Sequence, residues 1–176
     1  MFFPEAFQKR MQSVLQDEWV AFESTHQQSS LTSIRINPKK PPVPLDAKIP
    51  WTEFGYYLEQ RPSFTLDPTF HAGTYYVQEA SSMFLEQAVK QSVGLNRPLK
   101  VLDLCAAPGG KSTHLLSLIN NESLLVSNET IRSRASILSE NIQKWGNSNV
   151  VVTNNDPEDF QKLSGFFDLI VVDAPF

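Results

Sequence analysis

The stretch DLCAAPGGKS, Asp103–Ser112, joins an apolar segment to a segment with helical periodicity. Before it, residues 99–105 read LKVLDLC, which is typical of a buried strand, and after it residues 110–119 read GKSTHLLSLI. The order strand, acidic residue, small-residue turn and helix is that of the first unit of a doubly wound α/β sheet, where ligands lie at the carboxyl ends of the strands. The stretch therefore predicts both the fold and the place of its site.

The alternation of strands and helices continues along the chain. Further strands are predicted at 123–129, 149–156 and 166–175, with helices at 110–119, 130–146 and 157–163. Short, nearly all-apolar strands that alternate with helices indicate a parallel sheet covered by helices on both faces. We therefore assign residues 66–176 to the N-terminal half of one α/β domain with a Rossmann-like sheet.

Residues 1–65 have a different pattern and predict a small α+β module. Apolar residues recur at helical spacing at Phe7, Met11, Val14, Leu15 and Phe22, which indicates one amphipathic helix with a buried stripe. Residues 31–37, LTSIRIN, alternate and predict a short strand. The prolines that follow it, at 38, 41, 42, 44 and 50, favour a stiff, extended connector.

The charge balance counts mildly against a nucleic-acid partner. Fifteen Lys and Arg against nineteen Asp and Glu give a net charge of −4, the wrong sign for a protein that holds nucleic acid mainly by its own field. Basic residues gather in the N-terminal module at Arg35, Lys39 and Lys40. They predict either a solvated loop or a nucleic-acid face, and the charge pattern favours the solvated loop.

The cysteine and histidine content restricts the other classes of site. Cys105 is the single cysteine, so an internal disulfide is excluded, and with three histidines it makes no spaced zinc-ligand set. No run approaches the roughly 18 apolar residues of a membrane span, and the N-terminus lacks the features of a signal peptide. We therefore expect a cytoplasmic protein without a metal site or a membrane partner.

The end of the turn, GGKS at residues 109–112, also fits a nucleotide-phosphate loop, so two interpretations compete. A phosphate loop needs a glycine five positions before Gly110, and that position is Cys105. Pro108 also removes one of the N–H donors that would cradle the phosphates. The phosphate-loop interpretation is therefore disfavoured.

The other interpretation is a methyl-donor loop. Ala106, Ala107, Gly109 and Gly110 let the backbone approach a ligand closely, and the N-terminus of the following helix favours a carboxylate. Glu129 ends the next strand, about twenty residues on, which is the spacing of an acid that binds both hydroxyls of a ribose.

The third predicted strand ends in Asn155 and Asp156, where an adenine amino group would be received. Adenine, a free ribose and an amino-acid end together indicate S-adenosylmethionine, because the glycine pattern of a dinucleotide site is absent. The alternative is that Glu129 and Asp156 only cap the ends of strands.

DLCAAPGGKS, with GTYYVQEASSM upstream and VVDAP downstream, resembles the Sun family of RNA cytosine-C5 methyltransferases, most closely its bacterial RsmF type. The resemblance extends from TSIRINPKK to the end of the chain. It implies a class I methyltransferase sheet that uses S-adenosylmethionine, truncated here after the fourth strand. The activity implied is methyl transfer to cytosine C5 in RNA, with ribosomal RNA as the substrate class.

The resemblance also implies roles for individual residues. The cofactor would be bound by Cys105, Ala106, Ala107, Pro108, Gly109, Gly110, Lys111, Glu129, Asp156 and Asp173. Lys111 and Asp173, the latter at the mouth of the site, would orient the target base. Arg134 would be structural. The positions that would pack over the cofactor pocket, or cap a helix instead, are Gln78, Ser81 and Ser82.

Methylation at C5 requires a thiolate that first adds to C6 of the cytosine. The family uses two cysteines, one directly after DAP and the nucleophile at the end of a fifth strand. Here Phe176 follows Pro175, and no fifth strand is present. Cys105 lies in the cofactor loop, where we expect a small lining residue and not a nucleophile. We therefore expect a fragment that is inactive by itself.

The end of the chain at the fourth strand predicts an unpaired apolar edge at residues 166–172, and hence self-association through it. Two other functions stay open. One is a non-catalytic module that binds cofactor or RNA. The other is a methyltransferase of another substrate class, which acts by direct displacement and needs no thiol.

Overall fold

The computed structural model describes residues 3–41 and 44–174, and their contacts divide the chain into two compact units, with the division after Leu31. Three positions discussed above lie outside the described residues: Pro42 of the predicted connector, Pro175 at the end of the predicted fourth strand, and Phe176 at the expected cysteine position. Among the residues described, every helix is too short or too polar to traverse a lipid bilayer.

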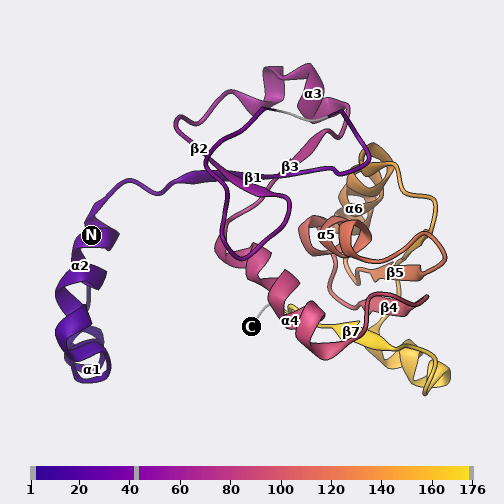
Figure 1. Ribbon diagram of the computed structural model, residues 1–176. Helices are drawn as coiled ribbons and strands as arrows, with labels where there is room; N and C mark the ends of the chain where they lie inside the picture. The colour runs from indigo at the N-terminus through magenta and orange to yellow at the C-terminus, as the bar shows by residue number, and fades with distance from the viewer. Residues whose placement is uncertain (1–2, 42–43, 175–176) are drawn as a thin grey trace. The chain divides into compact units, whose positions relative to one another are not determined.

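The N-terminal unit contains α1 (Glu5–Leu15) and α2 (Trp19–Gln27), joined by the 3-10 turn η1 (Gln16–Glu18) (Figure 1). Gln16 has a φ of +47°, so the single continuous helix expected here is wrong. The stripe is not buried as expected, because α1 has no buried residue and Val14 is 67% exposed. Two of its members do meet, since the ring centre of Phe7 in α1 lies 6.5 Å from that of Phe22 in α2, a contact that holds the two helices together.

The second unit begins with a three-stranded antiparallel sheet in the order β2-β1-β3. β1 (Thr32–Ile36) is the predicted strand, and it pairs with β2 (Gly55–Leu58) and β3 (Tyr75–Val77). The last two have four and three residues, too few to show the alternation from which strands are predicted. The expected module boundary at residue 65 falls between β2 and β3 and so separates strands of one sheet.

A small apolar core of Ile34, Phe64 and Tyr75 packs on this sheet. The chain reaches β3 through the 3-10 turn η2 (Phe64–Leu66) and the short helix α3 (Pro68–His71). Asp67 caps α3 and also accepts a hydrogen bond of 2.6 Å from the Tyr75 hydroxyl. This contact fixes where β3 begins.

The main sheet is parallel throughout, in the order β6-β5-β4-β7, and Figure 1 labels β5, β4 and β7. Its strands are β4 (Lys100–Asp103), β5 (Leu124–Asn128), β6 (Val150–Thr153) and β7 (Leu169–Val171). The helical segments around it are η3 (Ser81–Phe84), α4 (Leu85–Ser92), α5 (Gly110–Leu118), α6 (Arg132–Trp145) and η4 (Pro157–Leu163). The Rossmann-like α/β sheet predicted from the sequence is confirmed.

The helices α4, α5 and α6 pack on one face of the main sheet. Leu115 of α5 and Leu138 of α6 share a buried core with Val171 of β7. Ile170 and Val172 flank Val171 and therefore point to the opposite face, where each is more than half exposed. The expectation of helices on both faces is wrong for the described part of the chain, in which the last connection is only the short η4.

β7 pairs with β4 along one side, and it forms the edge of the sheet among the described residues. Self-association through this edge stays a prediction.

Candidate functional site

The loop from β4 to α5 is fixed by hydrogen bonds to its neighbouring strands. Ala106 N donates to Asn128 O at 2.8 Å, at the end of β5, and Leu104 N donates to Val171 O at 2.9 Å, at the end of β7. Gly109 has a φ of +111°, a conformation that L side chains rarely adopt. The loop therefore has one defined shape at the carboxyl edge of the sheet.

A cavity of about 210 Å³ opens over this loop. It is lined by Cys105, Ala106, Ala107, Pro108, Gly110 and Lys111 from the loop, Asp173 from the segment after β7, and Tyr76, Gln78 and Ser82 from the segment before α4. The structure thus brings together most of the residues predicted to bind a cofactor. Gly109 and Ser81 are not among the lining residues.

The Gly110 position leaves room for a ligand. A Cβ atom there would lie 3.4 Å from Tyr76 Cε1 and 3.7 Å from Gln78 Nε2, both of which line the cavity. A side chain would thus fill the space between the loop and β3. Gly110 belongs to a cradle of small residues, the geometry that lets backbone approach a ligand.

Lys111 and Asp173 form an ion pair at the mouth of the cavity. The side chain of Asp173 is 61% exposed and that of Lys111 is 27% exposed, so the carboxylate is the more accessible partner. The pair joins the start of α5 to the segment after β7, two elements that a target molecule would meet at the carboxyl edge of the sheet.

Two buried carboxylates near the loop each keep one oxygen without a hydrogen-bond partner in the described residues. Asp103 Oδ2 accepts from Ser112 Oγ at 2.7 Å, which leaves Oδ1 unpaired, and burial raises the pKa of Asp103 to about 6. Glu129 Oε1 accepts from Ile131 N at 3.0 Å, which leaves Oε2. Unpaired buried acceptors fit a ligand that carries hydroxyl or ammonium donors.

Arg134 connects Glu129 to the loop. Its Nη2 donates to the carbonyl of Ala107 at 2.8 Å, and its Nη1 lies 3.5 Å from Glu129 Oε2, at a distance that counts as an ion pair but without hydrogen-bond geometry. These contacts support the structural role expected for Arg134. Glu129 itself does not line the cavity.

Asp156 is not brought to the cavity. It is exposed after β6, and its side chain does not cap η4. The carbonyl of Asp156 accepts from Asp159 N at 3.0 Å, an ordinary turn contact. Adenine contact by Asp156 therefore stays a prediction.

Cys105 lines the cavity as a half-buried thiol. Burial raises its pKa, and the nearby carboxylates of Glu129, Asp103 and Asp173 raise it further. A protonated thiol is a poor nucleophile. This environment supports the expected role of Cys105 as a lining residue.

Arg35 lies in the interior, so its placement in a solvated loop or on a nucleic-acid face is wrong. Its side chain is fully buried, with Nε 2.9 Å from Gln78 Oε1 and Nη2 2.6 Å from Thr113 Oγ1. Nη2 also donates to Gly110 O at 3.1 Å. Arg35 thereby positions Gln78 and the first turn of α5. This role could not be predicted from a local pattern, because its partners are remote in the sequence.

Lys39 is exposed, as expected for a solvated residue.

Tyr76 is the cavity residue that the sequence analysis missed. The only available signal was its place in the GTYYVQEASSM segment, next to Gln78.

Comparisons with known proteins match both parts of the chain. Residues 3–80 match the family model of the N-terminal domain of 16S rRNA methyltransferase RsmF, and residues 95–176 match that of 16S rRNA methyltransferase RsmB/F. Ribosomal RNA small subunit methyltransferase F from Vibrio vulnificus (strain YJ016) is 34% identical over 197 residues, covering 99% of this chain and 40% of the relative. The protein of that name from Aeromonas salmonicida is 42% identical over 131 residues, covering 72% of this chain and 28% of the relative.

Two solved structures from Pyrococcus horikoshii are similar to this chain. A methyltransferase homologue superposes with a TM-score of 0.79 at 25% identity, covering 98% of this chain and 59% of that one. NSun6 superposes with a TM-score of 0.58 at 29% identity, covering 65% of this chain and 29% of that one. The chain spans two fifths or less of the length of the two curated relatives above.

Proposed function

Because the chain belongs to the RsmB/F family of S-adenosylmethionine-dependent 16S rRNA methyltransferases, we propose that it binds S-adenosylmethionine and serves the methylation of cytosine C5 in ribosomal RNA. The cavity at the carboxyl end of β4 supports this function most directly. It combines a cradle of small residues, nearby buried carboxylates with unpaired oxygens and the Lys111–Asp173 ion pair.

The loop residues and the carboxylates behind them would hold the cofactor. Ala106, Ala107 and Gly110 line the cavity without filling it. Glu129 Oε2, which has no hydrogen-bond partner among the described residues, would accept from ribose hydroxyls, and its ion pair with Arg134 would hold the carboxylate beside the loop. When bound, S-adenosylmethionine supplies an activated methyl group on its sulfonium.

Asp173 and Lys111 would orient the target base. A carboxylate accepts from the exocyclic N4 amino group of cytosine, which distinguishes cytosine from uracil. The more accessible partner of the ion pair is Asp173, and Lys111 holds its carboxylate in place. A cytosine at the mouth of the cavity is therefore the base that fits this pair.

Cys105 takes no part in the covalent step. Its raised pKa keeps the thiol protonated, whereas C5 chemistry needs a thiolate that adds to C6. Residues 3–174 are thus assigned the binding of the cofactor and the orientation of the base. Methyl transfer is proposed for the whole protein and not for these residues alone, because this chain spans only 40% of the relative from Vibrio vulnificus.

Isothermal titration calorimetry of the full chain with S-adenosylmethionine tests the cofactor site. We expect binding that Glu129→Ala weakens about tenfold or more, because a charge-assisted hydrogen bond is lost. Glu122→Ala, at an exposed acid before β5, is the matched control and is expected to leave the affinity unchanged. A chain that is folded by circular dichroism and does not bind, or an equal loss in both variants, would overturn the cofactor assignment.

The substrate is tested in cells. Deletion of the gene is expected to remove one methylcytidine from small-subunit ribosomal RNA, measured by nuclease mapping with mass spectrometry. An unchanged methylcytidine content together with a lost methyl group on another nucleotide would contradict the cytosine assignment.

A further inference from the structure

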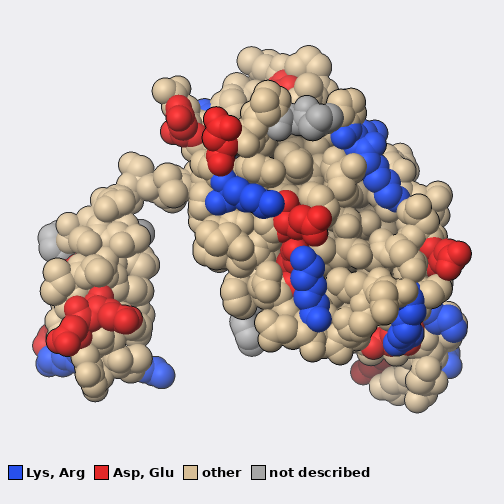
Figure 2. All heavy atoms as spheres, in the orientation of Figure 1, with Lys and Arg blue, Asp and Glu red and all other residues tan. Residues whose placement is uncertain are grey.

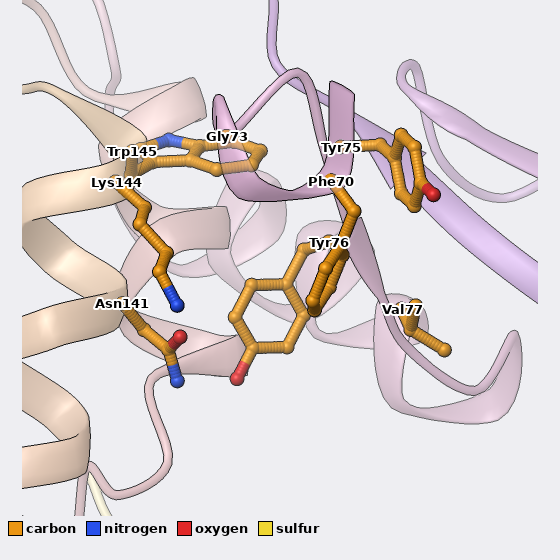
Figure 3. Close-up of a pocket in the computed structure, with 8 residues that line it drawn as sticks. All are labelled: Phe70, Gly73, Tyr75, Tyr76, Val77, Asn141, Lys144 and Trp145. Carbon is orange, nitrogen blue, oxygen red and sulfur yellow. The ribbon is translucent and has the colours of Figure 1, made fainter. Parts of the chain in front are cut away.

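A second cavity, of about 180 Å³, lies between α3 and β3 on one side and α6 on the other (Figure 3). Its lining residues are Phe70, Gly73, Tyr75, Tyr76, Val77, Asn141, Lys144 and Trp145. Tyr76 also lines the cofactor cavity, so the two cavities share one aromatic wall. We propose that this second cavity binds one unstacked nucleotide of single-stranded RNA, an inference that rests on the proposed function.

The walls of the cavity are fixed in the protein itself. Asn37 Nδ2 donates to Gly73 O at 3.1 Å and to Trp145 O at 2.8 Å, which ties the turn before β3 to the end of α6. A Cβ atom on Gly73 would lie 2.0 Å from Lys144 O, so only glycine permits this approach. A preformed cavity binds a ligand without a large ordering penalty.

The aromatic walls are backed by a buried cation. The guanidinium carbon of Arg35 lies 4.6 Å from the ring centre of Trp145 and 5.9 Å from that of Tyr76. These contacts hold both rings from behind, since Arg35 is fully buried. The cavity therefore offers aromatic surface in a fixed position, which is how proteins receive an unstacked base of single-stranded RNA.

Polar groups gather on one side of the cavity, as a nucleotide requires. Figure 3 shows the amide of Asn141 and the ammonium of Lys144 reaching from α6 toward the hydroxyl of Tyr76. Asn141 Nδ2 already donates one N–H to Pro108 O at 2.8 Å, so its second N–H and its Oδ1 are left to pair with a base. Lys144 Nζ forms an ion pair with Oε1 of the exposed Glu140 at 2.6 Å, and it places a positive charge at the rim of the cavity.

Basic residues continue beyond the cavity. Lys40 lies next to Gly146 at the end of α6, and Lys39 precedes it on the same loop, with its Nζ 2.7 Å from Asn121 Oδ1. Figure 2 shows Lys and Arg side chains in a line over the region where Figure 1 draws α6. In a chain with a net charge of −4, such a local group is what can attract a phosphate backbone.

Fluorescence anisotropy of the full chain with a short labelled single-stranded RNA tests the stacking wall. Phe70→Leu keeps the apolar contact with Phe64 and Tyr75 but removes an aromatic face. We expect it to weaken RNA binding about fivefold or more. The matched control is Phe166→Leu, because Phe166 is also partly exposed beside a lysine, with Lys100 Nζ 4.5 Å from its ring centre.

The salt dependence of the same binding tests the charged rim. Lys144→Gln is expected to lower the slope of log affinity against log salt by about 0.7, the value for one phosphate contact on a single strand. Lys162→Gln is the matched control, because Lys162 also pairs with an acid on its own helical segment, Asp159, at 3.1 Å. The control is expected to leave the slope unchanged.

Photo-cross-linking with thiouridine-substituted RNA locates the nucleotide. Cross-links to Phe70 or Trp145, which line this cavity and not the cofactor cavity, support the proposal, and cross-links confined to Tyr76 or to other segments overturn it. Equal losses in the cavity and control variants also overturn it. If the chain binds cofactor but no RNA, this inference fails and the cofactor assignment stands. If RNA cross-links in the cavity but the chain does not bind cofactor, the cofactor assignment fails and the RNA site stands.

Discussion

The guanidinium carbon of Arg35 lies 4.6 Å from the ring centre of Trp145, and its Nη2 donates to Thr113 Oγ1 at 2.6 Å. One side chain of β1 therefore contacts both α5 and α6. Its hydrogen-bond acceptors in the described residues are carbonyl, hydroxyl and amide oxygens, and no carboxylate is among them. Burial lowers the pKa of Arg35 to about 9. The small sheet is therefore joined to α5 and α6 by a cation held through directional hydrogen bonds.

Replacement of this cation by a smaller one is expected to destabilise the fold. Arg35→Lys keeps the charge but cannot reach Gln78, Gly110 and Thr113 together, because an ammonium lacks the planar fork. We expect a loss of about 3 kcal/mol or more in the free energy of unfolding, measured by urea denaturation. Arg132→Lys, at an exposed position of α6, is the control and is expected to change it by less than about 0.5 kcal/mol. Equal effects of the two variants would contradict the role of Arg35.

The two glycines of the cofactor loop are expected to respond differently to alanine. Gly109 has a φ of +111°, so Gly109→Ala should lower the free energy of unfolding by about 1–3 kcal/mol through backbone strain. Gly110 is the first residue of α5 with an ordinary φ, so Gly110→Ala should not strain the backbone. Its methyl group would enter the space before Tyr76 and Gln78, and we expect it to weaken cofactor binding.

Thermal unfolding and calorimetric titration of both variants separate these effects. A Gly110→Ala protein with wild-type affinity would show that the cofactor does not approach this part of the loop. A Gly109→Ala protein with wild-type stability would mean that the loop adopts another conformation.

The parts of the fold that the sequence predicts are those with a long, regular pattern. The strands and helices from β4 to β7 were predicted because each has a continuous apolar run or helical periodicity, and Gly146 does end α6 with a φ of +88°. β2 and β3 escaped prediction because four or three residues cannot show a period. Gln16 interrupts the first helix without any signal such as glycine or proline.

The buried polar contacts could not be predicted, because they join residues far apart in the chain. Arg35 and Thr113 are separated by 78 positions, and a lone arginine in an alternating strand is normally solvent-facing. Glu86 and His114 are likewise buried together from two helices, 28 positions apart. The cofactor loop was predictable because its residues are consecutive, so local sequence alone specifies strand, turn and helix.

Asp103 is expected to make the protein less stable as the pH rises. Burial raises the pKa of its carboxyl to about 6, above the ordinary 3.8, so the native state binds this proton more tightly than the unfolded state. The stabilisation is fully present below about pH 4 and is lost by about pH 6. In Asp103→Asn this loss should vanish, so relative to wild type the variant gains up to about 3 kcal/mol across this interval. Urea denaturation at several pH values measures it, and parallel profiles would contradict the assignment.

His114 is expected to act in the opposite direction. Burial lowers its pKa to about 4 from the ordinary 6.5, although its hydrogen bond of 3.1 Å with Glu86 opposes the shift. The unfolded state takes up this proton first as the pH falls, so stability is lost between about pH 6.5 and pH 4, by up to about 3 kcal/mol. His114→Gln removes the titrating group and should flatten this acid limb of the stability profile, even if the variant is less stable at neutral pH. His26→Gln, on exposed α2, controls for the loss of one histidine. An acid limb that is equally steep in His114→Gln and in the wild type would show that the histidine is not the group that makes the fold acid-sensitive.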